Sequence, residues 1–181
     1  MAARHAGERV KSARSGHTLA EMLFVLAIAA ILASMAAPAM RAMLQQHRLS
    51  TTVNDFFAAV TLARSEAVRR GAQVVLLPAG AGWRSGWVVA IDRNANLQYD
   101  AGDELLYSHA PPAADVTIVS SFTDNSQPYM AYGASGQSRS RTGAAQAGSW
   151  QFSCGGQRRK IIVNFLGRPR SCNPDGGNSP C

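Results

Sequence analysis

The feature that most limits how this chain can fold is an uncharged apolar run near its start. It covers the nineteen residues from Met22 to Met40, MLFVLAIAAILASMAAPAM. At a rise of about 1.5 Å per residue, a helix of this length matches the thickness of a bilayer core. Bases outnumber acids before the run, which favours an N-terminus on the cytoplasmic side. The sequence therefore predicts one membrane-spanning helix, with everything after it outside the cytoplasm.

A secretory signal is the alternative interpretation of this segment. Its apolar region would be shorter and would end at a small-residue cleavage site, a role that the letters SMAAPAM fit. Two features count against it. Glu21 places a carboxylate at the start of the apolar region, where an unpaired charge is costly. The helical pattern also continues beyond Met40, with Pro38 removing one backbone hydrogen bond inside it.

Residues 41–70 form the amphipathic continuation of this predicted helix. Apolar side chains recur there at spacings of three and four residues, which predicts one buried face. The members of this stripe are Leu49, Val53, Phe56, Val60, Ala63 and Ala67. Gly71 follows as a typical helix terminator. We expect one helix from about His17 to Arg70, with a membrane half and a half that packs on a folded domain.

After Gly71 the pattern changes to short strands rich in Val, Ile, Tyr and Trp and separated by Gly, Pro, Asn and Ser. The predicted strands are AQVVLL, GWVVAID, ELLYSH, DVTIVSS, YMAY, SWQFS and KIIVNFL. No helical pattern lies between them. The sequence therefore predicts an α+β fold in which the long helix packs on an antiparallel sheet or sandwich. Residues 133–148 have almost no large apolar side chain and predict a flexible loop or hairpin tip.

The letters SGHTLAEMLFVLAIAAILASMAAPAM resemble the N-terminal signature of type IV pilins and pseudopilins. The shared features are a glycine after a short basic leader, Thr-Leu, and a glutamate in the fifth position after that glycine. The resemblance implies that a prepilin peptidase removes residues 1–16 by cutting after Gly16, and that the new amino terminus at His17 is methylated. It also implies that residues 17–40 serve both as membrane anchor and in assembly.

Two residues of this segment have assembly roles under that resemblance. A lone carboxylate in hydrocarbon needs a cation, and the amino terminus created at His17 lies one helical turn from Glu21. In a packed fibre the amino terminus of a neighbouring subunit would serve equally. A proline at the place of Pro38 marks, in pilins, a point where the helix can unwind on assembly; the alternative is a simple kink in an anchor.

Residues 48–106 are similar to the FimT/GspH-type minor pilins and pseudopilins. The GspH side of this family belongs to type II secretion. The FimT side belongs to type IV pili and includes members that bind DNA during natural transformation through a C-terminal Gly-Arg-x-Arg motif. The resemblance implies the pilin fold, a periplasmic domain over residues 71–181, and partnership with other major and minor pilins and with inner-membrane lipid.

The charge distribution identifies the cationic part of that domain. The chain carries a net charge of +7 and a pI of about 10.0, which favours an anionic partner. Residues 85–130 hold six acids and only Arg93 as a base, whereas seven bases follow from Arg139 onward against Asp175 alone. Any nucleic-acid site is therefore expected in the C-terminal region.

Gly167, Arg168, Pro169 and Arg170 match the Gly-Arg-x-Arg pattern. In extended backbone, side chains two residues apart project to the same side, and a proline favours extended backbone at the residue before it. Two guanidinium groups placed in this way can each bind a phosphate through paired hydrogen bonds. The alternative is a solvated pair that protects a sheet edge from aggregation. Further candidates for the cationic surface are Arg158, Lys160, Arg139 and Arg141.

The three cysteines, Cys154, Cys172 and Cys181, lie in the last 28 residues and lack metal-ligand spacing. They predict a disulfide if this end of the chain reaches an oxidising compartment. A bridge between Cys154 and Cys172 would pin the arginine turn to a neighbouring strand. A bridge between Cys172 and Cys181 is the alternative, because pairing does not follow from sequence.

The letters DRNANLQYDAGDE at residues 92–104 resemble a calcium-binding loop. Oxygen-bearing side chains stand at positions one, three, five, nine and twelve: Asp92, Asn94, Asn96, Asp100 and Asp103. Leu97, however, occupies the position where an EF-hand needs glycine, which favours a polar hairpin connection over a metal site. The four histidines are scattered, and no catalytic constellation is evident. We therefore expect neither an enzyme nor a cofactor.

The residues and the resemblance together predict a minor pilin of the type IV pilus, anchored in the inner membrane and later part of a fibre. Its globular domain would bind DNA without sequence preference, mainly through Arg168 and Arg170, for DNA uptake. The competing prediction is a structural minor pilin or a type II secretion pseudopilin that helps to initiate a fibre and does not bind DNA.

Overall fold

The architecture is that of a computed structural model, which describes residues 18–176 and 181. The chain divides into two units, Met1–Arg41 and Ala42–Cys181, and helix α1 (Leu19–Arg70) belongs to both. The helix begins at Leu19, where the hydroxyl of Thr18 accepts a hydrogen bond from the backbone N–H of Glu21 (3.3 Å) and caps the first turn. Gly16 and His17 lie outside the described residues.

The N-terminal unit consists of the apolar part of α1. Its large apolar side chains are exposed, including Leu23, Phe24 and Ile31. Among the described residues, α1 is the helix that is long and apolar enough to cross a membrane. Pro38 lies within the helix, which continues on both sides of it. An exposed apolar surface on all sides of a helix is typical of a segment that is buried in lipid or in an assembly.

In the second unit, α1 buries one face only. All six residues of the predicted apolar stripe are buried, together with Thr52 and Ala59. Gly71 ends the helix with positive φ (64°), and the backbone N–H of Ala72 donates to the carbonyl of Ala67 (3.3 Å). This is the closure that glycine provides after a helix, as the sequence predicted.

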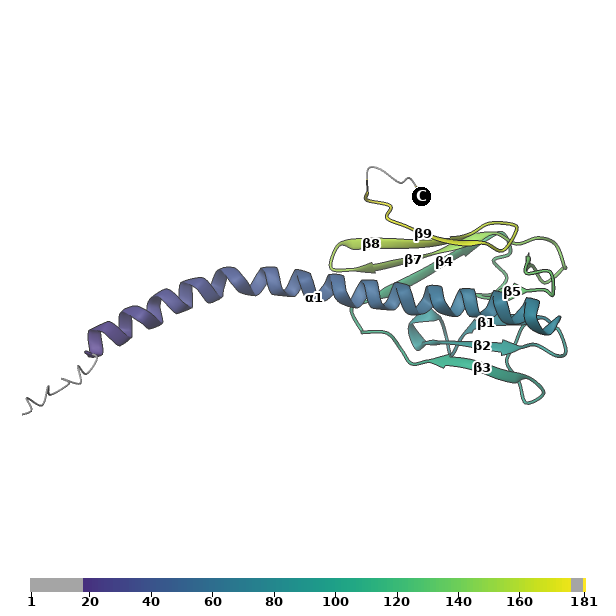
Figure 1. Cartoon of the computed structure of the whole chain (residues 1–181), viewed down its shortest axis with the longest axis horizontal. Helices are drawn as coiled ribbons and strands as arrows, with labels where there is room; N and C mark the ends of the chain where they lie inside the picture. Colours follow the sequence, from purple (N-terminus) through teal and green to yellow (C-terminus); the bar gives the residue numbers. More distant parts are fainter. Residues whose placement is uncertain (1–17, 177–180) are drawn as a thin grey trace, which may run out of the picture. The chain divides into compact units, whose positions relative to one another are not determined.

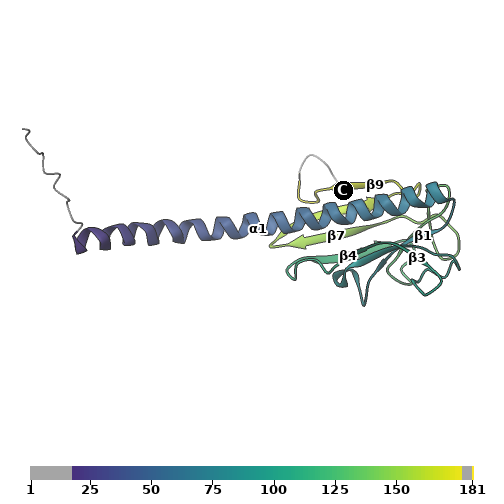
Figure 2. The same cartoon turned by 60° about the horizontal axis from the view of Figure 1, so that its bottom comes forward.

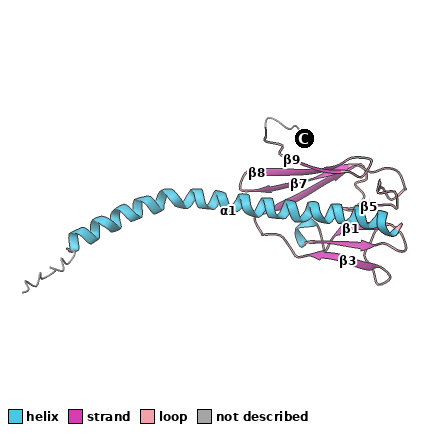
Figure 3. Cartoon of the chain, in the orientation of Figure 1, coloured by secondary structure: helices cyan, strands magenta, loops and turns pink. Residues whose placement is uncertain are grey.

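The strands that follow form two antiparallel sheets (Figure 1, Figure 3). The five-stranded sheet has the order β3-β2-β1-β5-β6, and the four-stranded sheet has the order β4-β7-β8-β9. The bounds of the nine strands are β1 Val74–Pro78, β2 Trp87–Ile91, β3 Glu104–His109, β4 Thr117–Phe122, β5 Met130–Tyr132, β6 Ser138–Arg139, β7 Gly148–Cys154, β8 Gln157–Val163 and β9 Pro169–Cys172. A short 3₁₀ helix, η1 (Trp83–Ser85), precedes β2.

The predicted α+β class is confirmed, and each of the seven predicted strands overlaps an observed one. Two strands were missed. The first is β6, which lies inside the segment predicted to be a flexible loop. The second is β9, which contains Arg170 and directly follows Arg168. The last predicted strand was also too long, because β8 ends at Val163 and the chain turns there.

The main core lies between α1 and the two sheets, which both face the helix (Figure 2). Phe56 of α1 is fully buried at its centre. Its ring contacts aromatic rings from both sheets and from η1 edge-on, with centroids 4.9 to 5.3 Å away. These rings belong to Trp83, Trp87, Trp150 and Phe152. One side chain of the helix therefore joins both sheets into a single core.

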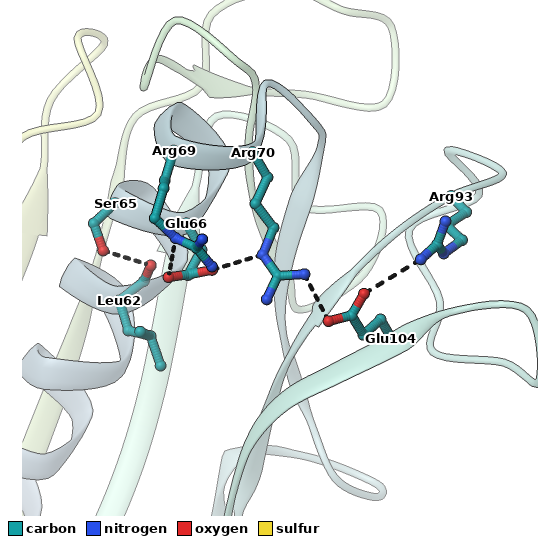
Figure 4. A network of polar contacts seen from close by, with 7 residues as sticks. All are labelled: Leu62, Ser65, Glu66, Arg69, Arg70, Arg93 and Glu104. Atoms are coloured by element: carbon teal, nitrogen blue, oxygen red, sulfur yellow. Dashed lines mark hydrogen bonds and ion pairs between the residues drawn. The ribbon is translucent and has the colours of Figure 1, made fainter.

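A polar network fixes the end of α1 to the first sheet (Figure 4). Glu66 accepts hydrogen bonds from Arg69 (3.0 Å to one oxygen) and from Arg70 (2.8 Å to the other). Arg70 also donates to Glu104 of β3 (2.6 Å), which Arg93 approaches from the other side (3.2 Å). The hydrogen bonds from Arg69 and then Arg70 lower the pKa of Glu66 to about 2.

We predict that Phe56→Ala lowers the free energy of unfolding by about 3–5 kcal/mol, because it leaves a cavity where both sheets meet the helix. Chemical denaturation of the full chain in neutral detergent micelles, followed by near-UV circular dichroism, measures this loss. Phe57→Ala is the matched control, since Phe57 is only partly buried beside the same core. Equal losses for the two variants would contradict the central place of Phe56.

A second prediction concerns the stability of the chain in acid. Because the folded-state pKa of Glu66 lies below that of the unfolded chain, the carboxylate stabilises the fold above about pH 4.5, and this contribution is lost as the pH falls toward 2. Glu66→Gln should therefore be less stable than wild type at neutral pH, with a difference that shrinks over that window. Denaturation of both proteins across pH 7 to 2 tests this. A difference independent of pH would be inconsistent with an ionic role.

Candidate nucleic-acid interface

The Gly-Arg-Pro-Arg stretch lies in the hairpin formed by β8 and β9, and β9 is an edge strand of the four-stranded sheet. Gly167 and Arg168 complete the turn, and Pro169 opens the strand. Pro169 pairs with Val163, and Arg170 pairs with Ile162. A proline is compatible with the first residue of an edge strand, because its missing N–H leaves no central ladder bond broken.

Asn164 organises the turn between the two strands. Its side-chain oxygen accepts hydrogen bonds from the backbone N–H groups of Leu166 (3.1 Å) and Arg168 (3.0 Å). The carbonyl of Asn164 accepts a further bond from the N–H of Gly167 (2.8 Å), and its own N–H donates to the carbonyl of Arg168 (3.3 Å). These four bonds fix the backbone immediately before the arginines.

Gly167 has two structural reasons to be glycine. Its φ of +75° lies in the left-handed region. A Cβ atom there would also stand 2.4 Å from the carbonyl oxygen of Gly136 and 2.9 Å from the ring of Tyr132. The hairpin tip thus packs against the end of β5 and the turn after it. Gly136 in turn accepts a hydrogen bond from Arg64 of α1 (3.0 Å), so the tip lies beside the last turns of the helix.

The register decides which side chains share the outer face of the sheet. Ile161 and Val163 of β8 are buried, so Lys160 and Ile162 point outward. Arg170 pairs with Ile162 and therefore shares its face. Arg168 precedes Arg170 by two residues, about 6.6 Å along an extended chain, and both arginines are exposed. The structure brings Arg168, Arg170 and Lys160 to one surface, which we call the basic face.

The members of the basic face are not neutralised within the part of the chain that the structure describes. Neither Arg168, Arg170 nor Lys160 forms an ion pair with a described carboxylate. Arg158, near the start of β8, differs from these three residues because it has a carboxylate partner. Its Nε donates to both oxygens of Asp175 (3.1 and 3.2 Å), and this hydrogen bonding lowers the pKa of Asp175. Arg158 is therefore already occupied by a carboxylate.

The segment of residues 133–148, which carries two further candidate arginines, is not the flexible loop that the sequence predicted. Arg139 belongs to β6, and its guanidinium donates to the carbonyl of Gly143 (3.0 Å) and to the side chain of Gln137 (3.1 Å). Arg141 is exposed, and its backbone N–H donates to the hydroxyl of the buried Tyr129 (2.7 Å). The segment is ordered by backbone pairing and buried polar contacts rather than by large apolar side chains.

The predicted bridge between Cys154 and Cys172 is wrong. Cys172 is bonded to Cys181, and Cys154 is a buried free thiol. The reason is the strand order: Cys154 lies on β7 and Cys172 on β9, with β8 between them. Two strand spacings amount to about 9.6 Å, more than the roughly 7 Å between Cα atoms that a disulfide can span. The pairing that was left as the alternative is the one observed.

The loop at residues 92–104 connects β2 to β3, as the favoured interpretation predicted. Asp92 accepts hydrogen bonds from the backbone of Asn96 and Leu97 and from the side chain of Gln73. Asp100 accepts from the side chains of Asn94 and Asn96, and Asp103 accepts from the backbone of Arg93. The carboxylates thus hold the loop itself, and no described cluster of three or more His, Cys, Asp or Glu is placed to hold a metal.

One feature of the site was missed by the sequence reasoning. The predicted strand KIIVNFL includes Phe165 and Leu166, yet both are exposed at the hairpin tip. The signal was present, because an asparagine followed three residues later by glycine is typical of a type I turn. Asn164 and Gly167 stand at these two positions.

Comparison with known protein families supports the same architecture. Residues 52–167 match the family described as type II transport protein GspH, and residues 11–37 match the prokaryotic N-terminal methylation motif. Over 100 residues, the chain is 39% identical to the pilin-like protein PilA1 of Thermus thermophilus, a match that covers 53% of this chain. The chain spans about 60% of the length of that relative.

Solved structures of minor pilins and pseudopilins share the fold. The type IV minor pilin FimU of Pseudomonas aeruginosa superposes with a TM-score of 0.58 at 16% identity, covering 76% of this chain and 97% of FimU. The minor pseudopilin EpsH from the type 2 secretion system of Vibrio cholerae gives 0.52 at 10% identity, covering 71% of this chain and 99% of EpsH. The predicted pilin fold is thereby confirmed.

We predict that Gly167→Ala lowers the free energy of unfolding by about 1–3 kcal/mol from backbone strain, and further through its contact with Gly136. Gly156→Ala is the matched control: Gly156 has a φ of +84°, but a Cβ there would meet no atom within 4 Å. Denaturation of both variants separates strain from crowding. A Gly167→Ala loss no larger than that of Gly156→Ala would mean that the tip does not depend on this close approach.

Proposed function

The chain belongs to the family described as type II transport protein GspH, and we propose that its globular unit binds DNA without sequence preference for uptake in natural transformation. It is a type IV minor pilin or pseudopilin by its methylation motif and its fold. The basic face is the observation that carries the proposal. Two exposed arginines stand two residues apart at the start of an edge strand, with no described carboxylate bound to either.

The chemistry of this face suits a phosphate backbone. Each guanidinium presents paired donors that match two phosphate oxygens. The spacing of about 6.6 Å along the strand lets both arginines contact one polyanion at once. Contacts to phosphates carry no sequence information, and the basic face offers no arrangement of side chains for reading base edges, so binding without sequence preference is expected.

The rest of the charge distribution strengthens this proposal. Several other arginines of the globular unit are engaged by acids, among them Arg48 by Asp115 (2.9 Å) and Arg70 by Glu66 and Glu104. The acids of the loop between β2 and β3 are used to hold that loop. Arg64, Arg84, Arg139 and Arg141 also form no ion pair with a described carboxylate, but three of them donate to backbone carbonyl groups: Arg64, Arg84 and Arg139. On the hairpin of β8 and β9, Arg168, Arg170 and Lys160 share one face, which makes this face a local cationic patch.

A purely structural subunit is the competing function, and the edge position of β9 is the observation that favours it. Charged side chains on an edge strand prevent unwanted strand pairing, and arginines would serve that purpose without any ligand. Both functions use the same anchor. The two functions differ in whether Arg168 and Arg170 bind DNA, so substitutions of these arginines distinguish them.

We further propose that this protein is processed and placed as the N-terminal signature implies. Residues 1–16 would be removed by a prepilin peptidase, and His17 would become the methylated amino terminus. The apolar part of α1 would hold the protein in the inner membrane with residues 71–181 in the periplasm. Glu21 and Pro38 would then act when the subunit joins other pilins in a pilus or pseudopilus.

We predict that Arg168→Gln/Arg170→Gln weakens duplex binding by the full chain in neutral detergent micelles. Wild-type affinity should fall steeply with salt, and the double variant should flatten the log–log salt slope by up to about two, because two phosphate contacts are lost. Fluorescence anisotropy of a labelled duplex measures both quantities. Equal, weak binding by wild type and variant, for single-stranded DNA as well as for the duplex, would reject the proposed function.

The matched control is Arg48→Gln/Arg93→Gln, which removes the same charge from two ion-paired arginines elsewhere on the globular unit. This variant should bind DNA nearly as wild type does, because those guanidinium groups are already paired with carboxylates. A loss equal to that of the first variant would show that net charge, rather than the basic face, governs binding.

A further inference from the structure

The tip of the hairpin between β8 and β9 carries two adjacent apolar side chains in solvent. Phe165 is 55% exposed and Leu166 is 53% exposed. Neither contributes to the core, although Ile161 and Val163, a few residues earlier, are fully buried. An exposed aromatic ring beside an exposed leucine at a turn has no role in the fold that the structure shows.

The turn holds this pair in a fixed position. Asn164 and Gly167 bracket the two residues with the backbone hydrogen bonds described above. The hydroxyl oxygen of the buried Ser138 lies 3.3 Å from the carbonyl oxygen of Asn164, which places β6 beside the turn. A side chain presented by a rigid turn loses less conformational freedom on binding than one on a mobile loop.

The arginines make the surroundings of this tip cationic. Arg168 is three residues from Phe165, and the chain between them is the same hydrogen-bonded turn. A positively charged track with an aromatic platform is the combination that binds single-stranded nucleic acids, because unpaired bases stack on the ring while phosphates contact the cations. In a duplex the base faces are already stacked on each other and are not accessible to a ring.

We propose that Phe165 is a stacking platform for an unpaired base, with Leu166 flanking it, so that the hairpin favours single-stranded over double-stranded DNA. This inference rests on the proposed DNA binding and names the form of DNA that the site takes. Arg168 and Arg170 hold the backbone of the strand, and Phe165 takes a base exposed beside it.

A second protein subunit is the other class of partner for an apolar tip. Such a partner would have to offer an apolar pocket next to free carboxylates to match both parts of the surface. The acid-rich loop of another copy is poorly suited, because Asp92, Asp100 and Asp103 already accept hydrogen bonds within that loop. Charge complementarity therefore favours nucleic acid.

The test compares binding of an oligothymidylate with binding of a duplex of the same length by the full chain in neutral detergent micelles. Phe165→Ala should weaken oligothymidylate binding by about fivefold to 150-fold, the loss expected from one base–aromatic stack, while duplex binding changes by less than about twofold. Tyr99→Ala is the matched control, since Tyr99 is also an exposed aromatic residue but lies in the acid-rich loop. It should leave both affinities unchanged.

A substitution that keeps the stack provides a direct signal. Phe165→Trp should retain oligothymidylate affinity, and its exposed indole should be quenched when a base stacks on it. The three native tryptophans are buried and should not respond. Unchanged near-UV circular dichroism of both variants establishes that the fold is intact.

The outcomes separate this inference from the proposed function. If wild type binds neither DNA, the proposed function and the inference both fail. If wild type binds DNA but Phe165→Ala weakens single-stranded and duplex binding equally, or weakens neither, the stacking role is overturned and the proposed function stands. If Phe165→Ala impairs association with other subunits and leaves DNA binding intact, the tip is a protein contact and the inference is wrong.

Discussion

The burial of one face of α1 against two separate sheets is the constraint on which the rest of the globular unit depends. The stripe from Leu49 to Ala67 shares one core cluster with buried residues of both sheets. Phe56 contacts rings from both sheets, so the helix acts as the common wall of the core. The inner faces of β7 and β8 pack in this core, so their outer faces remain in solvent. The basic face lies on that outer face of the sheet.

The same helix meets two environments along its length. Its first part is apolar on all sides and exposed, whereas its second part is apolar on one side and buried. Ion pairs at its end attach it to the first sheet through Glu66, Arg70 and Glu104. The acids near that end form ion pairs, and the acids of the loop before β3 accept hydrogen bonds within that loop. The hairpin of β8 and β9 has no comparable supply of acids, apart from Asp175 on Arg158, and this contrast leaves its arginines available.

The parts of this structure that sequence could predict are those set by local periodicity. The spacing of Leu49, Val53 and Phe56 defines the buried face of the helix, and Gly71 defines its end. Short runs rich in Val, Ile, Tyr and Trp, bounded by Gly, Pro, Asn and Ser, located seven strands. The two missed strands lack this signal, because β6 has two residues and β9 contains a proline and an arginine; both are held by pairing to a neighbour. Strand order excludes a bridge between Cys154 and Cys172, and strand order is a non-local property that cysteine spacing does not reveal.

The Gly-Arg-Pro-Arg stretch shows how a short motif combines two kinds of constraint. Gly167 is required by a left-handed turn and by its contact with Gly136, and Pro169 suits the first position of an edge strand. These two residues are explained by the hairpin alone, without any ligand. The arginines are different, since no described contact in the fold uses their guanidinium groups. Only Arg168 and Arg170 of this motif can therefore indicate a function. They do so because the turn of Asn164 and Gly167 presents them on an open face.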